Sequence, residues 1–520
     1  MNKSPLGASG PTRRDVLAGA AATAAGLLLP AMARAQEPKR GGRLRLAVSG
    51  GSSTDSLDPT AITGAMVGAL IGQARNGLLE IDGSGQLQPE LAEAWEAVRP
   101  AADRWRLKLR KGVEFHSGKT LDADDIIYSF GLHLRKGSPS ALNSVLSGIT
   151  EIAKDGQDAV VISLSSGNAD FPVLLSDPRL QIVQNGDAEF DKGNGTGGYI
   201  LQEWRHGVRS IAKRNPNYWK AGHGNFDEVE TLVIEDINAR TSALRTGDID
   251  VMNAVDRSTA SLLGAVGGIE LVVQNGYKHY TLPMRCDTAP FKDNNVREAI
   301  KYAMDRQLLL DRVLYGFGYL GNDHPIPNSL RDFATPTELP QRAYDPDKAK
   351  FHLKQAGLGS LKVQLNTSEG AFTGAVDAAV LVQESARAAG IEIEVVRQPS
   401  DGYWSNVWRV KPWVMSYWSG RPTADWIFTE GYLSTASYND AFWANERFDK
   451  LLLQARAELD QAKRREMYVE MQRIVSGNGG QCIPVFAADI LAKTDKLAHG
   501  PVAVNWDMDG YKLADRWWFA

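Results

Sequence analysis

This sequence predicts a mixed α/β protein of more than one lobe, and three observations lead to that class. The chain has 520 residues, too many for one core when a domain typically takes about 100 to 200 residues. Short segments that alternate apolar and polar residues indicate strands, and longer segments with apolar residues every three or four positions indicate helices. Both kinds recur along the chain, so we expect strands and helices to be mixed in every lobe.

The first 35 residues have the pattern of an export signal. Arg13 and Arg14 precede an apolar stretch over residues 16–30, and Ala33-Arg34-Ala35 follows as a small-residue cleavage site. The stretch is diluted by Ala, Gly and Thr, whereas a membrane span needs about 20 strongly apolar residues. We therefore expect a cleaved twin-arginine signal peptide over residues 1–35 and a location in a bacterial periplasm.

Strand patterns come next along the chain. Residues 104–110 alternate Trp or Leu with Arg or Lys, which is typical of a half-buried strand. A helix should follow the acidic stretch 122–125, because acids are favoured at a helix N-terminus. Two more strands are expected over residues 229–234 and 391–396.

Helical patterns dominate the second half. Apolar residues repeat every four positions over residues 296–308, which predicts one core-facing helix. Asn295 and Glu298 have the spacing of its capping box. Two further apolar stripes lie within residues 448–475, and Gly477 is expected to end the second.

Composition excludes several classes of protein. The net charge is only −4, which provides no basic surface for nucleic acid. The eight histidines are scattered singly, and the two cysteines cannot complete a four-ligand zinc site, so we expect neither a metal nor another cofactor. Cys286 and Cys482 could form a disulfide in an oxidising compartment or remain as buried thiols, and the sequence leaves both open.

A series of motifs then resembles a known family. They stand at residues 56–59 (SLDP), 105–118 (WRLKLRKGVEFHSG), 121–129, 195–199 (GTGGY), 215–219, 243–250, 290–306 and 344–357. In this order they resemble the extracellular solute-binding proteins of ABC transporters, family 5, the peptide, opine and nickel class. The resemblance covers nearly the whole chain after the signal.

The resemblance implies an α/β fold of the bilobal periplasmic binding protein-like type (class II, cluster C) with an extra inserted subdomain. Lobe I would take residues 36–85, 195–277 and 495–520, the inserted subdomain 86–194, and lobe II 278–494. It also implies a monomer that binds a small peptide, opine-like or amino-acid-conjugate solute between two lobes by hinge closure. That solute would be handed to the transmembrane subunits of an ABC permease.

Aromatic residues mark the expected ligand cleft. Six of the thirteen tryptophans lie between residues 403 and 443. Core packing should account for about half of the aromatics there, and the others are candidates for a cleft wall. We expect Trp404, Tyr417, Trp418 and Trp426 to contact the ligand.

Two arginines suggest the charge of the ligand. Arg421 stands where peptide-binding relatives commonly have an aspartate for the ligand's ammonium group, and Arg285 stands where relatives often have Asn. A guanidinium binds carboxylates and repels an ammonium, so we expect an anionic or zwitterionic ligand. Asp425 could take the amine role from a few residues away. The alternative, that these arginines only form salt bridges, remains open.

Enzyme motifs give little support to catalysis. Residues 193–198 match G-x-G-x-x-G, but a strand is expected after them, whereas a dinucleotide site needs a helix there. We therefore expect a non-catalytic protein. A periplasmic hydrolase of peptides or conjugates, and a ligand sensor or chaperone subunit, stay as alternatives.

Overall fold

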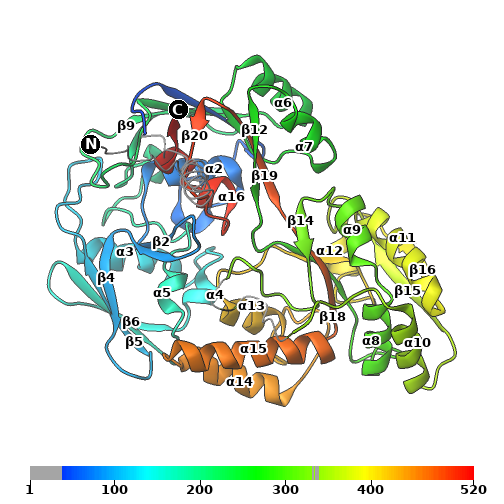
Figure 1. Cartoon of the computed structure of the whole chain (residues 1–520). Helices are drawn as coiled ribbons and strands as arrows, with labels where there is room; N and C mark the ends of the chain where they lie inside the picture. Colours follow the sequence, from blue (N-terminus) through cyan, green and yellow to red (C-terminus); the bar gives the residue numbers. More distant parts are fainter. Residues whose placement is uncertain (1–37, 331–332, 334–338) are drawn as a thin grey trace, which may run out of the picture.

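The computed structural model describes residues 38–330, 333 and 339–520. The predicted signal peptide over residues 1–35 lies outside these described residues. Figure 1 shows three groups of elements: one around a large sheet that includes β12 and β19, one around the sheet of β4 to β6, and one that includes the long helices α14 and α15.

The largest sheet has seven strands in the order β12-β19-β11-β1-β10-β9-β8. These strands are β1 (Arg43–Val48), β8 (Tyr199–Arg205), β9 (Arg209–Arg214), β10 (Glu228–Val233), β11 (Val251–Met252), β12 (Ile269–Gln274) and β19 (Asp489–Thr494). β1 pairs in parallel with β10 and β11, and the outer pairs are antiparallel. The strand predicted over residues 229–234 is β10.

Helices and short strands complete this lobe. They are η1 (Pro59–Ala61), α2 (Gly64–Ala74), η2 (Phe190–Lys192), α6 (Ile237–Thr246), α7 (Arg257–Gly264), β20 (Leu497–Ala498), α16 (Asp507–Gly510), α17 (Leu513–Arg516) and β21 (Trp518–Phe519). Helix α2 packs closely against the C-terminal segment, since a Cβ on Gly72 would lie 1.7 Å from the carbonyl oxygen of Tyr511. This close packing fixes the loop that carries Tyr511.

The inserted subdomain contains a four-stranded sheet in the order β4-β5-β7-β6. Its elements are β3 (Leu87–Pro89), β4 (Ala92–Ala97), β5 (Arg104–Leu109), α3 (Ala123–Leu134), α4 (Asn143–Leu146), β6 (Ile149–Lys154), β7 (Ala159–Leu164) and α5 (Phe171–Leu174). Strand β2 (Leu79–Ile81), from the stretch that the sequence assigned to lobe I, pairs with β3 and packs on the same core. Two predictions are confirmed here, the strand at β5 and the helix α3. Asp122 caps α3 and forms a capping box with Asp125.

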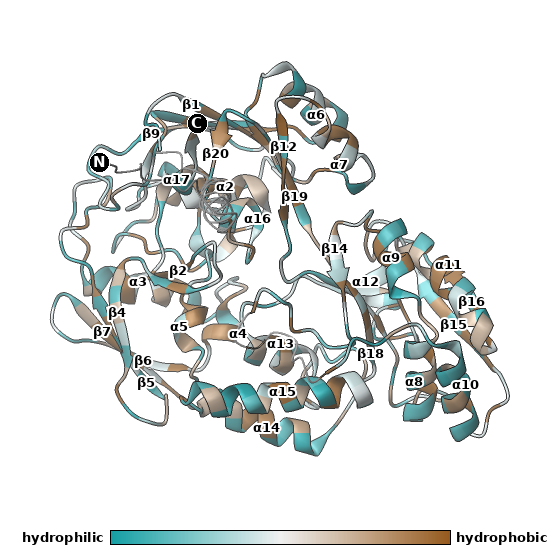
Figure 2. Cartoon of the chain, viewed as in Figure 1, coloured by the Kyte–Doolittle hydropathy of each residue, from teal (hydrophilic) through white to brown (hydrophobic). Residues whose placement is uncertain are grey.

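The second lobe has a four-stranded sheet in the order β14-β18-β13-β17 and the parallel pair β15–β16. Its strands are β13 (His279–Pro283), β14 (Gly318–Leu320), β15 (Leu361–Thr367), β16 (Ile391–Arg397), β17 (Ser416–Trp418) and β18 (Gln481–Ala487). Its helices are α8 (Asn294–Tyr302), α9 (Arg306–Arg312), α10 (Pro346–Gln355), α11 (Ala375–Ala386), η3 (Arg387–Ala389), α12 (Tyr403–Asn406), α13 (Ala424–Gly431), α14 (Glu446–Ala457) and α15 (Gln461–Asn478). Figure 2 shows hydrophilic and hydrophobic residues side by side along α14 and α15, as amphipathic helices require.

The single helix predicted over residues 296–308 is wrong, because two helices occupy that stretch. α8 ends at Tyr302, and Asp305 caps the start of α9 with a hydrogen bond from the backbone N–H of Leu308 at 3.0 Å. The N-cap of α8 is Asp293 and not Asn295. The apolar period therefore continues across a helix break, which periodicity alone does not detect.

Two adjacent segments connect the large sheet with the second lobe. β12 leads into β13, and β18 leads into β19, while β12 pairs with β19 and β13 pairs with β18. The first connection contains the predicted lobe boundary at residues 277–278. Strand β19, which the sequence assigned to lobe II, belongs to the large sheet.

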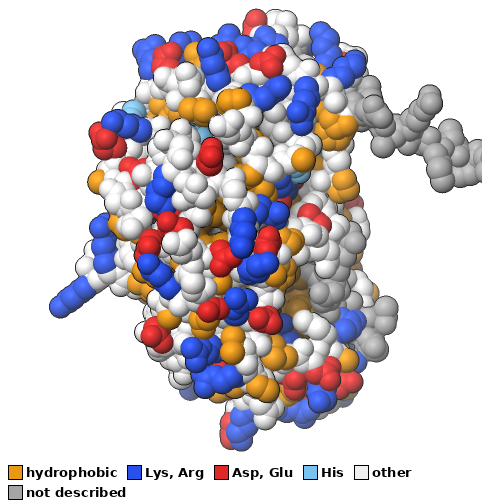
Figure 3. All heavy atoms as spheres, turned by 90° about the vertical axis from the view of Figure 1, so that its left-hand side faces the viewer, with side chains coloured by type: hydrophobic (Ala, Val, Ile, Leu, Met, Phe, Trp, Pro, Cys, Tyr) orange, Lys and Arg blue, Asp and Glu red, His pale blue; other side chains and the backbone are white. Residues whose placement is uncertain are grey.

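Both cysteines are free: Cys286 is half-buried and Cys482 is buried. Over the described part of the chain, no helix is long and apolar enough to cross a membrane. On the face drawn in Figure 3, acidic and basic side chains are interspersed. This mixture agrees with the small net charge of the sequence.

Candidate functional site

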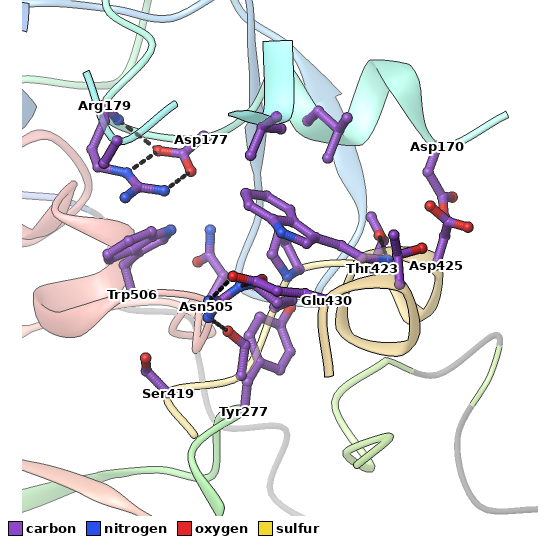
Figure 4. Close-up of a pocket in the computed structure, with 18 of the residues that line it drawn as sticks. Asp170, Asp177, Arg179, Tyr277, Ser419, Thr423, Asp425, Glu430, Asn505 and Trp506 are labelled. Carbon is purple, nitrogen blue, oxygen red and sulfur yellow. Dashed lines mark hydrogen bonds and ion pairs between the residues drawn. The ribbon is translucent and has the colours of Figure 1, made fainter. Parts of the chain in front are cut away.

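A cavity of about 1010 Å³ lies where the three groups of elements meet. Its wall takes side chains from the inserted subdomain between residues 141 and 179, from residues 277–278 and 504–511 beside the connecting segments, and from residues 417–438 of the second lobe. Seven aromatic residues are among them: Phe171, Tyr277, Tyr417, Trp426, Tyr438, Trp506 and Tyr511. Aromatic walls with a few placed polar groups are typical of small-molecule sites, and Figure 4 shows two of the aromatic residues, Tyr277 and Trp506, among the polar side chains of the wall.

A glycine brings the second lobe against the connecting segment. Strand β17 ends at Trp418, and Gly420 follows with a φ of +78°, a conformation that favours glycine. A Cβ at Gly420 would lie 2.1 Å from the Cβ of Tyr277. The close contact places the next residue, Arg421, on the cavity wall.

Arg421 is held in a fixed orientation. Its Nε and Nη2 donate to the two carboxylate oxygens of Glu430 at 2.5 and 2.9 Å, and Nη1 donates to the carbonyl of Gly420 at 2.6 Å. The guanidinium carbon lies 5.5 and 5.7 Å from the ring centroids of Trp418 and Trp426. A guanidinium has five N–H donors, so two donors remain beyond these three bonds.

Asp425 lies in the first turn of α13 and is paired within the chain. The Nε of Arg456 donates to its carboxylate at 3.0 Å, and Nη2 of Arg456 donates to Thr429 at 2.5 Å. Burial raises the pKa of Asp425 to about 6 in spite of this cation. From the sequence, Asp425 was a candidate to bind the amine of a ligand. In the structure, Arg456 is the cation that pairs with Asp425.

The aromatic residues predicted from the sequence divide into two groups. Tyr417 and Trp426 line the cavity together with Arg421 and Asp425. Trp418 does not line it, being 7% exposed within a core cluster of the second lobe. Trp404 is 42% exposed and touches Tyr417 edge-on, with ring centroids 5.7 Å apart, behind the cavity wall.

Arg285 lies outside the residues that line this cavity. Its guanidinium donates to both oxygens of Asp287 at 3.0 and 2.7 Å and to the carbonyls of Arg409 and Val410. It also stacks on Phe442, with its central carbon 4.1 Å from the ring centroid. The ligand-binding role of Arg285 stays a prediction, and the site described here is built without it.

The inserted subdomain and the C-terminal loop bring residues to the cavity that were not predicted from the sequence. Arg179 donates to both oxygens of Asp177 at 2.9 and 2.6 Å, and its central carbon lies 4.9 Å from the ring centroid of Trp506. Figure 4 shows this pair above Trp506. The only signal in the sequence was the adjacent pair Trp506 and Asp507, in the segment after β19. Such a pair is equally compatible with a ligand-binding site and with a hydrophobic core.

The glycine-rich segment 193–198 has a packing role. Cβ atoms at Gly195 and Gly197 would lie 2.2 and 2.4 Å from backbone atoms of Ala74 and Gln73, and strand β8 follows as predicted. None of these glycines lines the cavity. In the described residues no group of three or more His, Cys, Asp or Glu side chains is placed to hold a metal ion.

Comparison with known proteins adds the family context. The family model "Bacterial extracellular solute-binding proteins, family 5 Middle" matches residues 86–440. The oligopeptide-binding protein AppA of Bacillus subtilis is 25% identical over 451 residues, which cover 80% of each chain.

Solved structures show the same fold. The periplasmic murein tripeptide-binding protein MppA, in its unliganded open form, has a TM-score of 0.81 at 20% identity over 93% of this chain and 99% of that chain. AgaA from A. tumefaciens R10, in complex with agropinic acid, has a TM-score of 0.73 at 21% identity over 92% and 99%. The predicted bilobal periplasmic binding-protein fold is confirmed by this similarity.

Proposed function

The chain belongs to family 5 of the bacterial extracellular solute-binding proteins, the substrate-binding components of ABC importers, and from this premise we propose its ligand and its site. The ligand is a small zwitterionic solute, namely a short peptide, an opine-like compound or an amino-acid conjugate. It binds in the cavity between the lobes, and the loaded protein delivers it to a membrane permease.

The cavity itself is the observation that supports this proposal most directly. Its volume of about 1010 Å³ is at the upper end of the range of about 300 to 1,000 Å³ that small-molecule sites occupy. Two relatives make the class of ligand reasonable, since AppA is named for oligopeptides and AgaA was solved with agropinic acid. Both ligand types carry carboxylates on a small polar skeleton.

Arg421 is the residue we assign to the ligand's carboxylate. Glu430 orients its guanidinium, and two N–H donors are left for oxygens of a ligand. Tyr417 and Trp426 provide apolar faces on the same wall. Asp425 acts by holding Arg456 in position and does not contact the ligand's amine.

Closure and export complete the proposal. The two connecting segments act as the hinge, and ligand binding favours a closed state that the permease distinguishes from the empty, open one. The protein reaches the periplasm through the twin-arginine route and works as a monomer.

Native mass spectrometry of the protein purified from its own periplasm tests this function. We expect one small solute per chain, released by denaturation, that contains a carboxylate. Returning the solute at 100 times its Kd should stabilise the fold by about 2.7 kcal/mol, seen as a higher Tm. Trp426→Ala should reduce this shift, whereas Phe351→Ala, at a residue 55% exposed on α10, should leave it unchanged. A solute without a carboxylate, or no Tm shift, would contradict the proposal.

A further inference from the structure

The charges on the cavity wall do not balance. Four basic side chains line the cavity, and each one pairs with a carboxylate that also lines it. The pairs are Arg179 with Asp177 (2.6 Å), Arg421 with Glu430 (2.5 Å), Arg456 with Asp425 (3.0 Å) and Lys278 with Asp489 (3.7 Å). These eight groups contribute no net charge.

Two further carboxylates line the cavity, and only one of them has a cation. Asp170 pairs with Arg464 at 2.5 Å, and the guanidinium of Arg464 is 2% exposed behind the wall. Asp507 accepts hydrogen bonds from neutral groups, the Nδ2 of Asn253 at 2.7 Å and the backbone N–H of Met508 at 2.8 Å. Within residues 38–330, 333 and 339–520, no Lys or Arg forms an ion pair with Asp507; Lys278 acts on it only from a longer distance and is itself paired with Asp489. The cavity therefore carries one uncompensated negative charge.

A second acceptor lies on the same loop. The Oδ1 atom of Asn505 is buried without a hydrogen-bond partner among the described residues, and Asn505 lines the cavity. A buried acceptor without a donor costs free energy, and a rotation of the Asn505 amide away from Gly510 would let a ligand N–H in the cavity remove that cost. The ring of Trp506, between Asn505 and Asp507, already has the guanidinium of Arg179 4.9 Å from its centroid, so the carboxylate of Asp507 is the main attraction for a further cation. Figure 4 shows Asn505 and Trp506 directed toward the same space as Glu430.

The loop is rigid enough to serve as a site. Besides the contact of Gly72 with the backbone of Tyr511, a Cβ on Gly68 would lie 2.6 Å from the ring of Tyr511. The backbone N–H of Tyr511 donates to the carbonyl of Asp507 at 2.8 Å. A site held by a packed helix keeps its geometry before the ligand arrives.

We propose that Asp507 is the subsite for a cationic group of the ligand, an ammonium or a guanidinium, and that the Oδ1 of Asn505 accepts a second hydrogen bond from that group. This inference rests on the receptor function proposed above, and it adds a binding site for the cationic group of the ligand. An ammonium has three donors and no acceptor, which matches the two acceptors on this loop. The cation binds on the large-sheet side of the cavity and the carboxylate binds Arg421 on the opposite lobe, so one zwitterion contacts both lobes.

The test compares retained solutes in the wild type, Asp507→Asn and Asp293→Asn. Asp293→Asn is the matched control, because it removes one negative charge at the N-cap of α8, outside the cavity, and Asn caps a helix as well as Asp. Each protein is incubated with periplasmic extract of its host, with a tripeptide pool built without Lys, Arg or His, and with the same pool N-acetylated. After desalting, denaturing mass spectrometry measures what each protein retains.

We expect the wild type to retain solutes with a basic nitrogen and to lose the peptides on acetylation. Asp507→Asn should retain at least tenfold less, and Asp293→Asn should match the wild type. Asn505→Asp, which adds a second charge beside the first, should retain more. Equal retention by Asp507→Asn would overturn the proposal and leave the receptor function standing. Retained solutes without a basic nitrogen would overturn both the proposal and the zwitterionic class of the ligand, while solute binding itself would stand. A wild type that retains nothing from any mixture would overturn the receptor function and this inference with it.

Discussion

Arg421 illustrates how a single residue can be identified from sequence while its surroundings cannot. An arginine in place of an expected aspartate marked it, and the structure places it on the cavity wall. Its partner Glu430, nine residues later, gave no comparable signal. Asp507 was not predicted either. Its importance depends on which of the surrounding charged side chains already form ion pairs, and only the three-dimensional contacts show that.

The Arg421→Ala variant tests the carboxylate contact. We expect the affinity for the native solute to fall by about 2 to 5 kcal/mol, as when one partner of a buried charge pair is truncated, measured by isothermal titration calorimetry. Arg447→Ala is the control, because Arg447 is 71% exposed, pairs with Glu470 at 2.8 Å and does not line the cavity. Glu430→Gln, which retains an acceptor for Arg421, should lose less affinity than Arg421→Ala. Unchanged affinity in Arg421→Ala would remove this residue from the site.

At the scale of elements, local patterns predicted strands and caps better than helix breaks and cavity walls. Strands β5, β10 and β16 were predicted from alternating apolar and polar residues and from β-branched residues. Helix α3 was predicted from the acidic residues at its N-terminus. The break between α8 and α9 was not predicted, because the apolar stripe serves the same core on both sides of it. The cavity combines residues from four separate stretches with Arg456 and Asp489, so no single stretch carries its signature.

The loop after β17 offers a test of how elements position the site. Gly420→Ala would place a Cβ 2.1 Å from that of Tyr277 and force a φ of +78° on alanine, which costs about 1 kcal/mol or more. The loop should therefore move away from the connecting segment and carry Arg421 with it. We expect weaker ligand binding and a lower Tm.

Gly477→Ala is the control. Nothing lies within 4 Å of a Cβ at this position in α15, and alanine favours a helix, so the Tm of this variant should not fall. Wild-type affinity in Gly420→Ala would show that the close contact is unnecessary.

For the whole molecule, burial of ionisable groups determines how stability responds to acid. Burial raises the pKa of Asp425, Asp440 and Asp507 to about 6. It lowers the pKa of His133, His279 and His324 to about 4. The folded state therefore binds more protons at the aspartates than the unfolded state, and fewer at the histidines, between pH 7 and pH 5. The two sets act in opposite directions on the free energy of unfolding.

The ligand-free protein should consequently lose little stability on acidification. From pH 7 to pH 5, each of these aspartates adds about 1.3 kcal/mol to the free energy of unfolding and each of these histidines removes about 1.8 kcal/mol, so the six groups together remove about 1.5 kcal/mol. Urea unfolding at the two pH values measures it. His133→Gln removes one destabilising proton uptake, so its own difference between pH 7 and pH 5 should shift toward greater stability at pH 5 by about 1.8 kcal/mol. Asp440→Asn should shift the difference the other way. Comparing two pH values within one variant cancels the packing cost of the substitution, so an unchanged difference in both variants would mean that these groups titrate alike in the folded and unfolded chain.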